Sequence, residues 1–441
     1  MTGRGCSVMV LRVWRQSRAM EQKPTIGTVF VPGGMPKFTY VPRTERELEK
    51  ALQKVTDNLC KLVVVTGATK TGKTVLTRRV LSNQEPLVKV ECGRIQSEDD
   101  FWQECMIELG ARLDVELSES SGKAEGADIS GTLSVGAFGA KLKTQAQINE
   151  EINSQKIEKS KPAGSLRSRT IRYLRETSSI LIADDFHYLP RSLQGHIVRA
   201  LKSEIFDGFP FVIIAIPHRR YDAVRVEREM NGRIEPIKVP DWSIEELVKI
   251  PKIGFPLLGM KITDKLSKRL AEEAYGSPHL MQEFCKELAQ KSDELTEPSV
   301  ERSFDDSIFI KISEHTGKVI FDKLASGPRQ RSDRKQRRLV GGGTADIYRV
   351  ILMALSRLEP GMRKVDYESL RASVKDLLYQ EDMPQAHEVT RVLEKMAEIA
   401  SKEEMSVKVL DWDEEEQKLH ITDPFFAFFL KWSRDYVDTS V

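Results

Sequence analysis

Residues 67–74 read Gly67-Ala68-Thr69-Lys70-Thr71-Gly72-Lys73-Thr74 and directly follow the apolar run 61–66. A strand that leads into a G-x-x-x-x-G-K-T loop and then into a helix is the context in which this motif binds phosphate. Gly67 and Gly72 allow backbone conformations that aim successive N–H groups at phosphate oxygens. The stretch therefore predicts a nucleotide-binding loop; the alternative is a lysine-bearing surface turn.

The side chains at the end of this loop have separate expected roles. Lys73 should reach the β- and γ-phosphates of ATP, and Thr74 should offer its hydroxyl to Mg²⁺. A helix begins at Thr74, and its positive dipole end would point at the same phosphates. ATP and Mg²⁺ are therefore the expected cofactors.

Two adjacent carboxylates follow another apolar run, Ile180–Ala183. Sheets of α/β proteins bind their ligands at the carboxyl ends of the strands. Phosphoryl transfer needs a carboxylate that holds magnesium and a group that orients the attacking water. We assign Asp184, together with Thr74, to Mg²⁺ and Asp185 to the water. The alternative is a helix cap at a strand-to-helix turn.

Apolar runs alternate with helical segments between residues 61 and 239. Such runs predict parallel strands that are buried on both faces of a sheet. The fold class is therefore α/β, a P-loop NTPase with a doubly wound parallel sheet. Residues 243–290 have a helical pattern throughout, which predicts a helical lid, and residues 346–433 have the pattern of three helices followed by two short strands, which predicts a C-terminal winged helix. The expected divisions are a tail at 1–39, an ATPase core at 40–242 with a mobile insertion at 117–165, the lid at 243–292, a basic linker at 293–345 and the winged helix at 346–441.

The composition limits the class of protein. The chain has 441 residues, with Lys+Arg 68 against Asp+Glu 66, so attraction to nucleic acid would have to come from local patches. No apolar run reaches the roughly 18–20 residues of a membrane span. The five cysteines are scattered, which indicates reduced thiols in a cytoplasm and no metal cluster. Residues 1–19 are rich in arginine, which fits a presequence, a disordered tail or sequence upstream of a start at Met20.

The arrangement resembles the AAA+ and STAND group of P-loop ATPases, and within it the origin-recognition-type initiators, transposition regulators and archaeal ATPases. The resemblance covers roughly residues 40–290 and the C-terminal module. Residues 40–46 look like the segment that lies near the adenine in that group, which assigns Tyr40 and Arg43 to the nucleotide. Residues 231–237 resemble the arginine-finger segment, so Arg233 would reach the γ-phosphate of a neighbouring subunit in a homo-oligomer.

Two positions depart from the pattern of that group. The strand 211–216 looks like the sensor-1 strand, but Pro217 and His218 stand where a small polar residue is usual. The lid of the group often presents an arginine to the phosphates, and here the matching residue is His279. Both departures imply slow hydrolysis, and hence a switch rather than a motor.

The target of the C-terminal module is open at this stage. A basic run at 329–338, beside a glycine-rich stretch, favours contact with the phosphates of duplex DNA, or else is a solvated linker. The expected wing tip, Asp411–Glu416, is acidic and opposes such contact. The leading hypothesis is an ATP-dependent switch that acts on DNA or on a DNA-bound partner. The alternative is a STAND-type signalling ATPase, for instance in antiviral defence, whose winged helix docks a protein partner.

Overall fold

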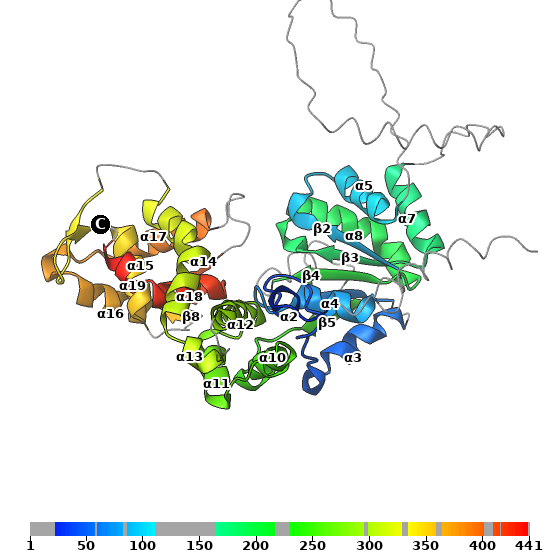
Figure 1. Ribbon diagram of the computed structural model, residues 1–441. Coiled ribbons are helices and arrows are strands. Elements are labelled where there is room, and N and C mark those ends of the chain that lie inside the picture. The colour runs from blue at the N-terminus through cyan, green and yellow to red at the C-terminus, as the bar shows by residue number, and fades with distance from the viewer. Residues whose placement is uncertain are drawn as a thin grey trace, which may run out of the picture.

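The computed structural model describes residues 23–57, 60–82, 86–110, 165–216, 230, 232–294, 299–328, 334–358, 364–400, 409–414 and 416–439. The expected insertion (apart from Ser165), residues 1–19, Pro217 and His218 lie outside these ranges. Figure 1 shows the sheet and its helices at one end of the molecule, the C-terminal module at the other and the lid helices between them.

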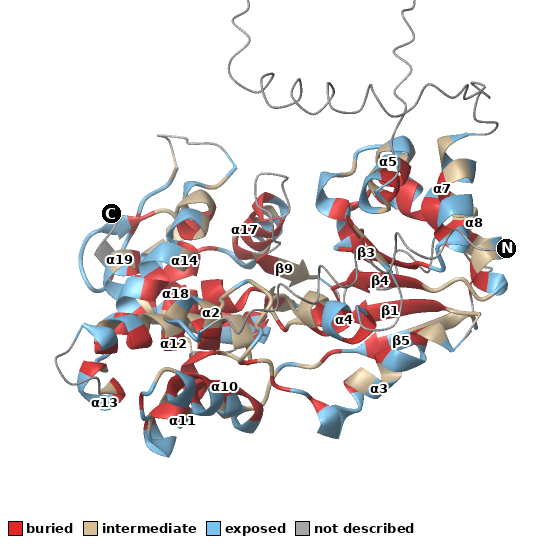
Figure 2. Cartoon of the chain, turned by 45° about the vertical axis from the view of Figure 1, so that its right-hand side comes forward, coloured by how far each residue is buried: buried red, intermediate tan, exposed pale blue. Residues whose placement is uncertain are grey.

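The central sheet of the described chain has five strands in the order β2-β3-β4-β1-β5, and every neighbouring pair is parallel. This confirms the predicted α/β fold with a parallel sheet. Burial along β1, β3 and β4 is continuous, as Figure 2 shows, because helices cover both faces. The strands are β1 (Leu62–Thr66), β2 (Leu87–Glu91), β3 (Ile180–Asp184), β4 (Phe211–Ala215) and β5 (Ile234–Lys238).

Alternating side chains of β1 enter two separate cores. Leu62 and Val64 pack with the helices of one face, and Val63 and Val65 with those of the other. The first face carries α5 (Glu98–Glu108), α7 (Leu166–Glu176) and α8 (Arg191–Phe206). The second carries α3 (Leu48–Gln53) and α4 (Lys73–Leu81). Short 3-10 turns complete the core, namely η1 (Thr44–Arg46), η2 (Lys54–Thr56), η3 (Cys92–Arg94) and η4 (Phe186–Tyr188).

The lid consists of α10 (Ile244–Leu257), α11 (Asp264–Glu273) and α12 (Pro278–Asp293). The predicted tail at 1–39 is wrong for residues 23–39, because α2 (Ile26–Val29) and Phe30 are packed into the lid core. A Cβ added at Gly254 of α10 would lie 2.3 Å from the Phe30 ring, so this glycine lets the segment dock closely. This N-terminal segment therefore packs against the lid before the chain enters the sheet.

The expected linker at 293–345 is also largely ordered structure. It contains α13 (Val300–Ser303), α14 (Ser307–Ser326) and the hairpin of β6 (Arg337–Arg338) and β7 (Thr344–Ala345). The sequence pattern does not predict α14, because polar residues interrupt its apolar side, yet Phe321 and Leu324 are fully buried. Gly317 of α14 lets Phe429 approach so closely that an added Cβ would lie 2.3 Å from it.

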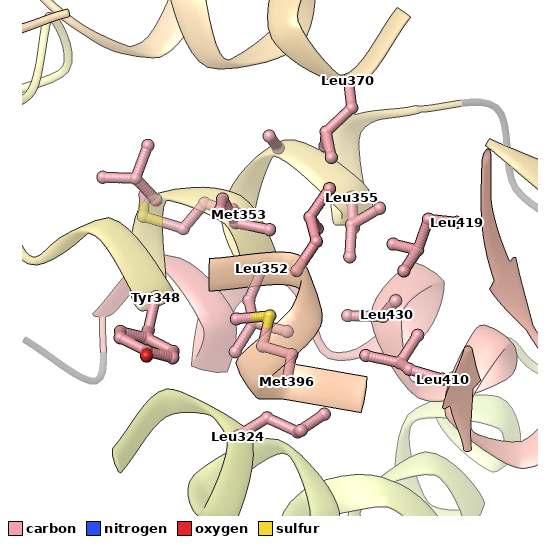
Figure 3. Packing of buried hydrophobic residues seen from close by; sticks show 14 of the residues in the cluster. Leu324, Tyr348, Leu352, Met353, Leu355, Leu370, Met396, Leu410, Leu419 and Leu430 are labelled. Carbon is pink, nitrogen blue, oxygen red and sulfur yellow. The ribbon is translucent and has the colours of Figure 1, made fainter. Parts of the chain in front are cut away.

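The C-terminal module follows the helix and strand order predicted for a winged helix, with one additional strand. Its three-stranded antiparallel sheet has the order β8-β10-β9. Leu324 of α14 and Leu430 join Leu352 and Met396 in its core (Figure 3). The elements are α15 (Ile347–Arg357), β8 (Lys364–Asp366), α16 (Tyr367–Leu377), η7 (Gln380–Asp382), α17 (Ala386–Ile399), β9 (Leu410–Asp413), β10 (Lys418–Ile421), α18 (Pro424–Trp432) and α19 (Arg434–Thr439).

Helix α18 belongs to the lid as well as to the C-terminal module. Phe428 packs against Phe284 of α12, and Phe426 enters the module core. The buried carboxylate of Glu273 accepts hydrogen bonds from Lys431 Nζ at 2.6 and 2.7 Å and from Trp432 Nε1 at 2.8 Å. The lid and the C-terminal module are therefore joined through one shared helix.

Two further observations concern the described residues alone. None of their helices combines the length and the apolar character that a bilayer crossing would require. Cys60, Cys92, Cys105 and Cys285 form no disulfide with one another. Among the described residues, no group of three or more His, Cys, Asp or Glu side chains is placed to hold a metal ion.

Candidate nucleotide site

The loop 67–72 lies at the carboxyl edge of the sheet, between β1 and α4. Gly67 has no room for a side chain, because an added Cβ would lie 2.4 Å from the carbonyl oxygen of Val239. Gly72 has φ +87° and Lys70 has φ +60°, both in the left-handed region. Trp242 Nε1 donates to the carbonyl of Thr71 at 2.9 Å, so the start of the lid holds the loop from outside.

Lys73 lies inside the curve of this loop. Its Nζ donates to the carbonyl oxygens of Gly67 at 3.0 Å and Ala68 at 2.9 Å, and the residue is only 8% exposed. Burial lowers the pKa of the Lys73 ammonium, while the nearby carboxylates of Asp185, Asp184 and Asp241 act in the opposite direction. The loop thus encloses one positive charge at the position expected to face the β- and γ-phosphates.

Thr74 and Asp184 form the candidate magnesium site. The Thr74 hydroxyl donates to Asp184 Oδ2 at 2.9 Å, and both groups present the hard oxygen atoms that Mg²⁺ prefers. Such sites commonly use one or two carboxylates together with substrate phosphates, so this donor set fits the ion. The structure therefore brings together the two residues that the sequence assigned to magnesium.

Lys89 of β2 adds a cation to the same carboxylate. Its Nζ lies 3.0 Å from Asp184 Oδ2 and 3.0 Å from Glu91 Oε1. Burial opposes its charged form, but the carboxylates of Asp184 and Glu91 outweigh burial and raise the pKa of Lys89. A bound magnesium ion would share Asp184 with this lysine, which the sequence gave no reason to single out.

Asp185 follows β3 and has φ +54°, an uncommon conformation for a residue other than glycine. It occupies the N-cap position of η4, but its side chain makes no capping hydrogen bond. Partial removal of the Asp185 carboxylate from water, and then the charge of Asp184, raise the pKa of Asp185 to about 6. Much of the residue is nevertheless accessible to solvent. The side chain of Asp185 is therefore not used as a helix cap.

A cavity of about 290 Å³ adjoins the loop, close to the lower limit of roughly 300 Å³ for small-molecule pockets. Val41 and Ile250 are among its apolar lining residues, and His187 and Asp185 are among its polar ones. Gln282 holds one wall in place, because its amide nitrogen donates to Thr39 Oγ1 at 2.8 Å and its Oε1 accepts from the Val31 amide at 3.1 Å.

Tyr40 and Arg43 both line this cavity, but their polar groups are engaged elsewhere. The Tyr40 hydroxyl bonds to Glu49 Oε1 at 3.1 Å, and burial, followed by the charge of Glu49, raises the Tyr40 pKa. The buried Arg43 guanidinium donates to both carboxylate oxygens of Glu246 at 3.1 Å and to the carbonyls of Pro240 and Asp241 at 2.9 and 3.1 Å. Arg43 therefore links the segment that precedes the sheet to the lid, where Glu246 lies.

His279 lines the cavity at the start of α12, with its ring against Gly33 and edge-on to Phe425 at 4.9 Å. Burial, and then the charge of Lys70, lower its pKa to about 4. His279 is therefore neutral near pH 7. It brings no positive charge to the place where the resembling ATPases often have an arginine.

Arg233 is not brought to this cavity. Because Leu62 pairs with Ile234 in the parallel register, Arg233 lies at the amino edge of the sheet. Five residues of strand, roughly 16 Å, separate that edge from the phosphate loop. The Arg233 guanidinium lies over the exposed ring of Phe206 at 4.9 Å. From this edge it does not reach the cavity of its own chain.

Several residues at the site were not singled out by the sequence, namely Lys89, Trp242, Gln282, Asp423 and Phe425. Four of them come from distant parts of the chain, and only the fold brings them to the loop. The sequence signal for Asp423 was its place before Pro424 at a helix start, which predicts a cap but not a partner.

Residues 56–221 match the protein family described as AAA domain. Among curated proteins, none matches the sequence. The solved structures with a similar fold include a Walker-type ATPase of Pyrococcus abyssi, 16% identical, with a TM-score of 0.52 over 91% of this chain and 98% of that one. They also include the ORC2 protein of Aeropyrum pernix in its ADPNP–ADP complexes, 13% identical, with a TM-score of 0.49 over 93% of this chain and 97% of that one.

At 16% identity the Pyrococcus abyssi structure shows the fold alone. The match to the AAA domain family covers the phosphate loop and both aspartates. Together they confirm the resemblance to AAA-type P-loop ATPases that the sequence predicted.

Proposed function

We propose that this protein is an ATP-binding, slowly hydrolysing oligomeric switch. The observation that carries the proposal is the convergence of Lys73, Thr74, Asp184 and Asp185 at one edge of the sheet, beside a cavity that the lid covers. In this assignment Lys73 faces the phosphates, and the cavity between Tyr40, Val41 and Ile250 takes the base.

Thr74 and Asp184 would hold Mg²⁺, which in such sites neutralises charge on the phosphates. Asp185 would orient the attacking water and accept its proton. Its side chain makes no helix-capping hydrogen bond, and the charge of Lys73 acts on it. Both observations suit a carboxylate that acts on the attacking water.

Three features support slow turnover. His279 is uncharged at neutral pH, Arg43 is committed to Glu246, and Arg233 lies at the opposite edge of the sheet. Among the described residues that line the cavity, Lys73 is the cation that the phosphate loop encloses, and the arginine, Arg43, is paired with Glu246. Assembly with a neighbour that supplies Arg233 would complete the site. The rate of hydrolysis would then depend on assembly.

Replacing Asp185 by Asn should keep ATP bound and lower hydrolysis by about 10²–10⁴-fold, because the amide positions water but accepts no proton. Asp184→Asn should instead weaken the magnesium-dependent part of ATP binding. Phosphate release and calorimetry with and without Mg²⁺ separate the two effects. Asp207→Asn, an aspartate paired with Arg175 at the opposite edge, is the control. Wild-type turnover in both site variants would make the aspartate pair a strand-end cap.

The charges of the C-terminal module bear on its target. The described arginines of the basic run are used inside the module: Arg334 pairs with Asp346, buried Arg337 with Glu388, and Arg338 with Asp382. Lys395 of α17 pairs with Glu398. These pairings reduce the charge available to DNA and favour the second candidate, a winged helix that docks a protein.

A titration against salt decides between the two targets. If Arg329, Arg331 and Lys335 contact duplex DNA, replacing all three by Ala should flatten the log–log salt dependence of binding by about 2–3. Fluorescence anisotropy of a labelled duplex, with ATP and Mg²⁺ present, measures this. Replacing the exposed lid lysines Lys261, Lys265 and Lys268 by Ala removes equal charge and should leave the slope unchanged. Undetectable binding even at low salt would assign the module to a protein partner.

A further inference from the structure

The C-terminal module touches the phosphate loop through Asp423. This aspartate is 2% exposed and caps α18, with Oδ1 accepting from the amides of Phe425 at 2.7 Å and Phe426 at 3.3 Å. Its other oxygen, Oδ2, lies 3.1 Å from Nζ of Lys70. One carboxylate thus serves a helix in the C-terminal module and a lysine in the loop that is expected to hold phosphates.

Lys70 is enclosed on more than one side. Its Nζ lies 3.6 Å from the centre of the Phe425 ring, and its backbone carbonyl accepts from the Ser277 hydroxyl at 3.3 Å. Burial lowers the pKa of Lys70, and Asp423 opposes that effect. The lysine is nevertheless about a quarter exposed on its side chain, so its ammonium can still leave Asp423 for another anion.

The helix that Asp423 caps is bonded to both the lid and α14. The C-terminal end of α18 is tied to the lid through Lys431 and Glu273, and the Ser433 hydroxyl bonds to Ser313 of α14 at 2.7 Å. Phe425 and Phe428 lie in the lid core. A change at Asp423 therefore acts on the lid and the C-terminal module together.

We propose that Asp423 is a positioning residue of the nucleotide site, where it competes with the phosphates of the nucleotide for Lys70. The inference rests on the proposed ATP binding. Lys70 lies three residues before Lys73 in the same loop, so phosphates held by that loop come within reach of its ammonium. Phosphates that attract Lys70 weaken its hold on Asp423, and the docked lid and C-terminal module weaken phosphate binding to the same extent, because such coupling is reciprocal.

The test replaces Asp423 by Asn in the full chain and measures ATP affinity by calorimetry with Mg²⁺. Asparagine caps a helix about as well as aspartate, so the substitution removes the charge and keeps the cap. ATP should bind about 5-fold tighter or more, the lower end of typical coupling between sites. Adenosine, measured as a competitor, should bind as it does to the wild type, because it has no phosphate to attract Lys70. In Lys70→Met, the further change Asp423→Asn should have no effect on ATP.

A matched control is Asp346→Asn. Asp346 also caps a helix of the C-terminal module and pairs with a basic residue, Arg334, but its partners lie within or next to that module. It should leave ATP affinity unchanged. If Asp423→Asn does not fold, Asp423→Ser keeps a capping oxygen and serves as the second variant.

The outcomes separate this inference from the proposed function. Failure of the wild type to bind ATP would refute the function itself. If the wild type binds ATP through Lys73 but Asp423→Asn binds it equally or more weakly, the competition is refuted and ATP binding stands. An equal gain in adenosine affinity would also refute it, because the effect would then not depend on phosphate.

Discussion

Replacing Lys73 by Ala should remove most of the ATP affinity and leave the fold intact. The buried Lys73 ammonium is held by the carbonyls of Gly67 and Ala68, and it is the cation that the loop encloses. A hydrogen bond to a charged group contributes about 1.5–3 kcal/mol, and a desolvated charge that faces several phosphate oxygens makes more than one such bond. Affinity should therefore fall by about 100-fold or more.

Calorimetry with ATP and Mg²⁺ measures this loss, and thermal unfolding verifies that the variant folds. Lys50→Ala is the matched control, because Lys50 is an exposed lysine paired with Glu47 on α3. It should bind ATP as the wild type does. Unchanged ATP affinity in Lys73→Ala would refute the phosphate-loop interpretation and the proposed function with it.

The parts of this site that the sequence predicted are local in the chain. The loop and the start of α4 are contiguous, so their spacing alone sets where Lys73 and Thr74 stand relative to one another. Asp184 was predictable because a buried apolar run ends there, and parallel strands end at one edge of the sheet. The structure places the Thr74 hydroxyl 2.9 Å from Asp184, across 110 residues of sequence.

The contacts that the sequence could not predict join residues that are far apart in sequence and carry no motif. Lys89 reads as an ordinary polar residue of an alternating strand, yet its ammonium lies beside Asp184. Gln282 and Val31 are 251 residues apart and form one wall of the cavity. Helix α14 was not predicted for a related reason. Its apolar side is defined by contacts with residues far away in the sequence, such as the contact between Phe321 and Phe429.

The sequence does not show which acidic groups the arginines pair with. The run at 329–338 suggests a surface for phosphates, but Arg337 is 2% exposed and donates to Glu388 and to the carbonyl of Asp382. Arg43 looks like a nucleotide ligand and is bound to Glu246. An arginine side chain can serve a buried acid as well as a phosphate, and sequence alone does not distinguish these partners.

Arg233→Ala should lower hydrolysis by up to about 10³–10⁵-fold, the range for arginine fingers, while ATP affinity stays unchanged. The register of β1 and β5 places Arg233 at the amino edge of the sheet, too far from the phosphate loop of its own subunit. Its guanidinium lies beside the exposed ring of Phe206, at a surface that a neighbouring subunit can reach. Wild-type turnover per subunit should therefore rise with protein concentration.

A mixing experiment shows directly whether Arg233 acts on a neighbouring subunit. Arg233→Ala retains Asp185 but lacks the finger, and Asp185→Asn retains the finger but lacks the base. Each should be nearly inactive alone, and a mixture should recover hydrolysis, because an Asp185→Asn subunit lends its arginine to an Arg233→Ala neighbour. Lys61→Ala removes a positive charge from the same edge, where Lys61 pairs with Glu235, and should leave turnover unchanged. Turnover that is independent of concentration and survives Arg233→Ala would mean that each subunit hydrolyses ATP with its own residues, and the oligomeric part of the proposal would then fall.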